Sequence, residues 1–141
     1  MKWNCPVCGR GFKTKNQWHS CYTASVEDHL QNKPKWIIDM FDEILSFSSE
    51  LGKIELNPVK TSIQLRAGAT FLGIKLKKTK IELEFFSKNE IEHPTTIKNL
   101  RISANRVFNE IVLNNENSFN EEIRTFIRES YKLVIEANDK T

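Results

Sequence analysis

The sequence predicts an α+β protein: an N-terminal zinc-binding module followed by an antiparallel sheet of five or six strands, with helices at both ends. Three observations lead to this expectation. All three cysteines lie within residues 1–21. Apolar residues recur at three- and four-residue spacing over 35–51 and again after 118, and they alternate with polar residues in between, which are the periods of helices and strands. We therefore expect a zinc-binding head over 1–30 and an α+β domain over 31–141.

The overall composition permits this organisation. The chain has 141 residues, 39% of them hydrophobic, and nine phenylalanines, enough for one domain with a real core plus a small module. The sequence contains no apolar run long enough to cross a membrane, and the start Met1-Lys2-Trp3-Asn4 does not have the pattern of a signal peptide. An odd number of cysteines is consistent with reduced thiols, so we expect a cytoplasmic protein.

The head contains the only recognisable motif of a chemical site in the sequence. Cys5 and Cys8 form a Cys-Pro-x-Cys-Gly knuckle, and His19 and Cys21 follow about ten residues later. Thiolates and imidazole in such spacing are ligands for tetrahedral zinc. The sequence therefore predicts a structural Zn²⁺ held by Cys5, Cys8, His19 and Cys21. Four protein ligands leave no open position for water, which disfavours metal-assisted hydrolysis.

Two alternatives stay open for this site. The spacing from Cys8 to Cys21 also fits a ββα finger, with Phe12 and Trp18 as its small core. On a helix His19 would point away from Cys21, and His29 would then supply the fourth ligand. The other alternative is a head without metal.

Helices are expected on either side of the strands. Ser25 is suited to cap a short helix, and Asn32-Lys33-Pro34 interrupts it. A second helix should run from about Lys35 to Leu51 and end at Gly52. The last helix should open with a capping box over Ser118-Phe119-Asn120-Glu121. The buried face of the second helix is expected to comprise Ile37, Phe41, Ile44, Leu45 and Ser48.

Alternating segments predict the strands. They lie at 54–56, 63–65, 72–76 and 81–85, with two more between 100 and 113 that turn at Ala104-Asn105. Lys75 and Lys77 are expected across from Glu82 and Glu84. Residues 87–98 are polar, contain Pro94, and should form a loop.

Nothing in the sequence predicts a catalytic site, so a binding module is favoured over an enzyme. The glycine-rich phosphate-binding and nucleophile-elbow motifs are absent, and only three histidines occur. Glu110 is the one acid in an otherwise apolar run, and we expect it to face solvent rather than bind a ligand.

Three kinds of partner follow. The first is nucleic acid, because residues 1–38 carry six Lys or Arg against two acids. Trp3 and Trp18 could also stack on bases. The six cations are Lys2, Arg10, Lys13, Lys15, Lys33 and Lys35. The second is a protein bound by the sheet face or the head. The third is a small ligand or substrate in a pocket between helix 35–51 and the sheet, using Lys60, Arg66 or Glu110. No membrane partner is expected.

The chain resembles a family of small bacterial proteins known only as a domain of unknown function. The resemblance covers nearly the whole chain and rests on CPxCGRxF at 5–12, NQWHSC at 16–21, EDHL at 27–30, KTxI at 60–63 and RESY at 128–131. It implies a small α+β domain behind a zinc-binding head, sometimes at the end of larger proteins that look like restriction or defence nucleases. It implies no activity. Members often carry a histidine pair where this chain has Phe108-Asn109-Glu110, and His29 matches the family pattern.

Overall fold

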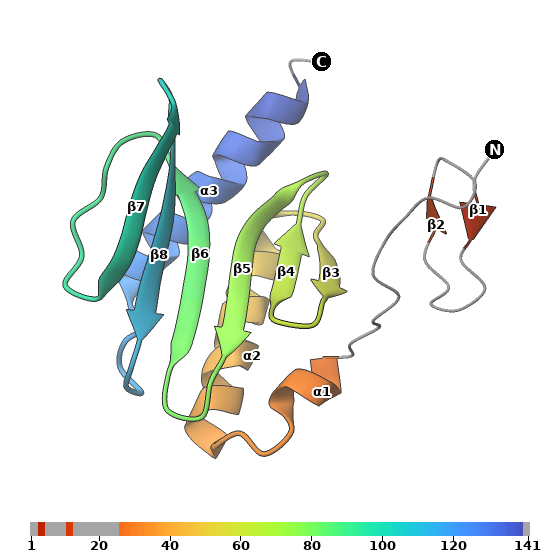
Figure 1. The fold of residues 1–141 in the computed structure, drawn as a ribbon, viewed down its shortest axis with the longest axis vertical. Helices are drawn as coiled ribbons and strands as arrows, with labels where there is room; N and C mark the ends of the chain where they lie inside the picture. Colours follow the sequence, from red (N-terminus) through yellow and green to blue (C-terminus); the bar gives the residue numbers. More distant parts are fainter. Residues whose placement is uncertain (1–2, 5–10, 13–25, 140–141) are drawn as a thin grey trace.

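The computed structural model describes residues 3–4, 11–12 and 26–139, with side chains from 26 to 137. Six antiparallel strands form one sheet in the order β3-β4-β5-β6-β8-β7. Helices α2 and α3 both lie behind this sheet (Figure 1), and α3 packs on β5 and β6. The α+β class and the six-stranded antiparallel sheet are thus confirmed. The elements after residue 25 are α1 (Val26–Leu30), α2 (Lys35–Leu51), β3 (Glu55–Pro58), β4 (Ile63–Arg66), β5 (Thr70–Leu76), β6 (Ile81–Ser87), β7 (Thr96–Ser103), β8 (Arg106–Leu113) and α3 (Glu121–Asp139).

Helix α2 has the expected bounds. Its N-cap is Pro34, whose φ of −60° suits the entry to a helix, and Gly52 follows its last residue. A Cβ at Gly52 would collide with the Tyr131 hydroxyl of α3, so glycine leaves room for the Tyr131 ring at the end of α2. The buried residues of α2 are Ile37, Met40, Phe41, Ile44 and Ser48, whereas Leu45 is only half-buried.

The sheet builds the core through strict alternation. Along β6 and β8 every second side chain is buried against the helices, as expected for strands with one covered face. The turn at Ala104-Asn105 is confirmed. The loop expected over 87–98 ends earlier, because β7 already begins at Thr96.

The capping box expected at Ser118 is wrong. Helix α3 begins at Glu121, and its cap is Asn120, whose Oδ1 accepts a hydrogen bond from the Ile123 amide at 3.2 Å. Ser118 Oγ instead accepts from the Asn115 amide in the preceding turn. The start is held further by Arg124, whose guanidinium lies 4.7 Å from the centroid of the Phe119 ring. Asparagine is as good an N-cap as serine, so the motif alone does not distinguish the two positions.

Helix α1 joins the α+β body. Val26 and Leu30 pack against the core, and His29 Nε2 lies 2.7 Å from the carbonyl oxygen of Val59, between β3 and β4. The division of the chain at residue 30 stays a prediction.

A buried serine ties α3 to the centre of the sheet. The β5–β6 ladder ends at the pair Leu72–Phe85. At the next position Ser130 Oγ donates to the carbonyl of Phe71 at 2.6 Å and accepts from the amide of Phe86 at 2.9 Å. Ser130 is fully buried. The hydroxyl therefore takes the place of a strand-to-strand hydrogen bond and satisfies both backbone groups.

Candidate functional site

The four predicted zinc ligands, Cys5, Cys8, His19 and Cys21, lie outside the described residues. What is described beside them is a pair of two-residue strands, β1 (Trp3–Asn4) and β2 (Gly11–Phe12), which run antiparallel with Trp3 opposite Phe12. Residues 5–10 join the two strands, and the Cys-x-x-Cys pair belongs to this segment. A ββα finger also begins with two antiparallel strands, so the pairing is compatible with a metal-binding head.

His29, the alternative fourth ligand, is partly engaged. The hydrogen bond to the Val59 carbonyl requires the proton on Nε2 and leaves Nδ1 as an acceptor. Metal-binding histidines commonly donate their other ring N–H to a carbonyl in this way. Within the described ranges no three His, Cys, Asp or Glu side chains gather as a metal site. Both ligand assignments therefore remain open.

The sheet has one face that no described element covers. Helices α2 and α3 occupy the far side in Figure 1, and the side chains between the core positions face the near side. One row of in-register residues crosses all six strands on this near face; it consists of Asn57, Gln64, Gly73, Glu84, Glu110 and Lys98. We call this side the open face.

Lys75 joins the two acids of that row. Its Nζ lies 2.6 Å from Glu84 Oε1 and 3.5 Å from Glu110 Oε1. The pKa of Lys75 is raised, mainly by its hydrogen bond to Glu84, with burial opposing and the charges of both acids adding. Lys75 therefore stays protonated at neutral pH and acts as a fixed cation rather than as a base. Lys75 lies opposite Glu82 as expected, but Lys77 lies beyond the end of β5.

Strand β7 carries an exposed apolar surface. Ile97, Leu100 and Ile102 are 52%, 51% and 56% exposed, and every residue from 97 to 103 is exposed. The strand is the last in the sheet order, while α3 packs further in, on β5 and β6. Both faces of β7 therefore lack a cover among the described elements. An exposed apolar edge strand is a place where proteins interact.

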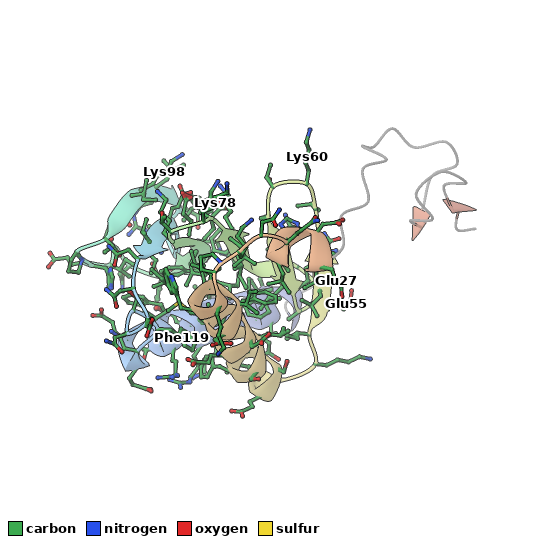
Figure 2. All side chains as sticks on the ribbon, turned by 90° about the horizontal axis from the view of Figure 1, so that it is seen from below. Glu27, Glu55, Lys60, Lys78, Lys98 and Phe119 are labelled. Carbon is green, nitrogen blue, oxygen red and sulfur yellow. The ribbon has the colours of Figure 1, made fainter. Side chains whose placement is uncertain are left out.

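A rim of lysines borders the open face. Figure 2 shows Lys60, Lys78 and Lys98 along the sheet side of the molecule, opposite α2. Lys77 precedes Lys78 in the same turn and is also exposed. We call Lys60, Lys77, Lys78 and Lys98 the lysine rim. By contrast, Lys35, one of the cations expected to meet nucleic acid, pairs with Asp39 at 2.8 Å.

The three side chains expected to serve a pocket between helix 35–51 and the sheet lie apart in the described part of the chain. The inner face of α2 belongs to the same closed apolar core as the buried strand residues. Glu110 lies on the opposite side of the sheet with Lys75, Lys60 follows β3, and Arg66 ends β4. These three side chains therefore do not converge beneath α2.

The α+β body has a recognised family. The family described as "Domain of unknown function (DUF5655)" matches residues 26–134, from α1 into α3. This chain belongs to that family. The DUF5655 match thus contains the open face and β7, and it begins after the last cysteine. No curated protein and no solved structure matches the chain. Among the described helices none is long and apolar enough to cross a membrane.

Proposed function

We propose that this DUF5655 protein is a non-catalytic binding module that takes a protein partner on β7. The observation that carries the proposal is the set of three large apolar side chains on this strand, each more than half exposed. Buried apolar area contributes about 25 cal/mol per Å², so covering these side chains would favour association. Residues scattered singly would need no explanation, but these three are clustered on one eight-residue strand.

The charge of β7 indicates the chemistry of its partner. The strand contains Lys98 and Arg101 and no acid. Arg101 is held by Glu90 from the preceding loop, at 2.9 and 3.0 Å, whereas Lys98 is exposed at the open face. An apolar segment flanked by acidic residues would match this surface, and a second copy of the strand would bring like charges together.

A photo-crosslinker at position 100 tests this proposal. With benzoylphenylalanine in place of Leu100, we expect a defined crosslinked protein after irradiation of cells. The same probe at Asp42, exposed on α2, serves as the control. With the purified partner, Leu100→Glu should weaken binding by tenfold or more, about 1.4 kcal/mol, because a charge would enter an apolar contact. Folding should be unchanged, because the side chain is exposed.

Two outcomes would contradict it. One is a crosslinking pattern at position 100 that equals the pattern at position 42. The other is an identified partner whose affinity is the same for Leu100→Glu as for the parent. A crosslink between two copies of the chain, with a dimer in solution, would replace the acidic partner by self-association.

The proposal includes a structural zinc ion in the head. Cys5, Cys8 and Cys21 supply thiolates, and His19, with His29 as the alternative, supplies an imidazole. Support comes from the ligand spacing and from the antiparallel pairing of β1 with β2. The ion would hold the head together and perform no chemistry. Reduced thiolates of this kind suit a cytoplasmic location.

Nucleic acid is the second candidate partner, and the lysine rim favours it. Exposed lysines along one edge suit phosphates, which bind by charge and carry no sequence information. The predicted head adds Lys2, Arg10, Lys13 and Lys15.

The salt dependence of the affinity for nucleic acid tests this second candidate function. Fluorescence anisotropy with a labelled duplex should show affinity falling steeply between about 50 and 200 mM salt. The triple variant Lys77→Ser, Lys78→Ser, Lys98→Ser should bind more weakly to every sequence and lower the salt slope by up to about three, roughly one per lost phosphate contact. Lys132→Ser, on the exposed face of α3, is the matched control. Absence of binding at low salt, or binding indifferent to salt, would rule out this function.

A further inference from the structure

The open face contains a hollow above Gly73, in the middle of β5. Its volume is about 110 Å³, room for roughly four waters at about 30 Å³ each. Its floor is the strand at Gly73, which is itself buried. Side chains around it include Gln64, Thr70, Glu84, Phe86 and Phe108. The centre of the hollow lies on β5, while its aromatic wall reaches Phe108 of β8, the strand next to β7, so the hollow and the proposed partner surface are neighbouring sites on the open face.

The fold itself does not require glycine at this position. The backbone at Gly73 is not left-handed, since Gly68 is the glycine with a positive φ in the described chain. A Cβ at Gly73 would meet Glu84 Cβ and Oε2 at 3.5 Å, an ordinary van der Waals contact. Glycine inside a strand costs stability relative to other residues, and it often marks a place where a ligand approaches the backbone. The absence of a side chain at Gly73 therefore suggests that a group from another molecule fills the hollow.

The walls of the hollow offer acceptors and aromatic rings. Glu84 Oε1 is taken by Lys75, but Oε2 lies beside the space above Gly73. Gln64 Oε1 accepts from Asn57 at 3.1 Å, and Phe86 and Phe108 stand edge to face with ring centroids 6.0 Å apart. Phe86 already receives the Arg106 guanidinium 5.0 Å from its centroid. A carboxylate oxygen next to aromatic rings suits a cation with N–H donors.

We propose that the hollow above Gly73 receives the cationic end of a lysine or arginine side chain from a partner protein. The ammonium or guanidinium would donate to Glu84 Oε2 while its alkyl stem lies against Phe86 and Phe108. This goes beyond the function proposed for β7, because it names a second contact with the opposite charge preference. The Glu84 contact is tested by small cations that need no β7 partner, so its failure can be told apart from failure of the β7 proposal.

Small probes test the hollow without knowledge of the partner. In ¹H–¹⁵N NMR titrations, n-butylguanidinium or n-butylammonium should shift the amides of Gly73, Glu84 and Phe108 with a Kd of about 1 mM, as expected for so few atoms. The neutral n-butylurea should shift them far less. Glu84→Gln should weaken cation binding by about tenfold, because a charged hydrogen bond becomes a neutral one.

Matched variants separate binding from folding. Gly73→Val should fill the hollow and abolish the shifts, while Gly73→Ala should keep a Tm no lower than the parent. Glu82→Gln, on a neighbouring acid that does not line the hollow, should bind the probes as the parent does. Equal shifts from n-butylurea, or no shifts from either cation at about 50 mM, well above that Kd, would overturn the proposal. A fall in Tm of about 4 °C or more in Gly73→Ala would also overturn it, since the fold would then need the glycine.

Discussion

Replacing Cys8 with serine should remove zinc from the protein and unfold its first 22 residues, while the α+β domain keeps its cooperative unfolding. Structural zinc contributes about 10–16 kcal/mol in small fingers, and a head with so few apolar residues has little else to stabilise it. The core of the domain runs from Ile37 to Val134, within the α+β body. Metal analysis should find one zinc per parent chain, and circular dichroism should show a melting transition retained in the variant.

Companion variants identify the fourth ligand. His19→Ala should lower zinc affinity strongly if His19 binds, and His29→Ala should do so if the ββα arrangement holds. His29→Ala should also lower domain stability, because His29 Nε2 hydrogen-bonds the Val59 carbonyl. Ser20→Ala, between the predicted ligands, is the control that should retain zinc. Purified parent protein without zinc would contradict the proposed head, whatever the variants do.

Replacing Ser130 with alanine should lower the free energy of unfolding by about 2–5 kcal/mol. The change strips the Phe71 carbonyl and the Phe86 amide of their common partner, and each buried unsatisfied group costs about 1–3 kcal/mol. Alanine is the better helix former, so helix propensity cannot account for a loss. Urea unfolding followed by circular dichroism should show a lower midpoint at an unchanged slope.

Thr125→Ala is the matched control for this experiment. Thr125 lies on the same helix, is exposed, and donates its hydroxyl back to the Glu121 carbonyl at 3.0 Å. Its removal leaves no buried group without a partner, so stability should change by less than about 0.5 kcal/mol. If Ser130→Ala were equally mild, the two backbone groups would have to find water or each other, and the serine would not tie α3 to the sheet.

The prediction of the fold rested on the periodic spacing of apolar residues along the sequence. Helix α2 begins and ends where the apolar spacing and Gly52 place it, and the alternating segments became β3 to β6 and β8. Such local patterns work because each element must bury one face, and the period shows which kind of element can do so. The cap of α3 was misplaced by two residues because serine and asparagine are both suitable caps, and the structure uses Asn120.

The candidate surfaces were not predictable in the same way. Leu100 and Ile102 alternate like core residues, yet they are 51% and 56% exposed. Nothing in their local sequence differs from that of Ile111 and Leu113, which are fully buried on the neighbouring strand. The difference lies in the strand register: Leu100 pairs with Phe108 and therefore lies on the open face, whereas Ile111 and Leu113 lie on the face of the sheet that the helices cover. Gly73 similarly looked like an ordinary member of an alternating strand.

By itself the sequence determined the kinds of elements, their order and the ligand set that predicts zinc, because hydrophobic period, turn residues and cysteine spacing are local properties. Only the tertiary structure decided which side chains remain uncovered, that Lys75 joins Glu84 to Glu110, and that Ser130 enters the β5–β6 ladder. These depend on strand register and on which face of the sheet the two helices cover. Contacts between residues distant in the chain set both, and no short window of sequence contains them.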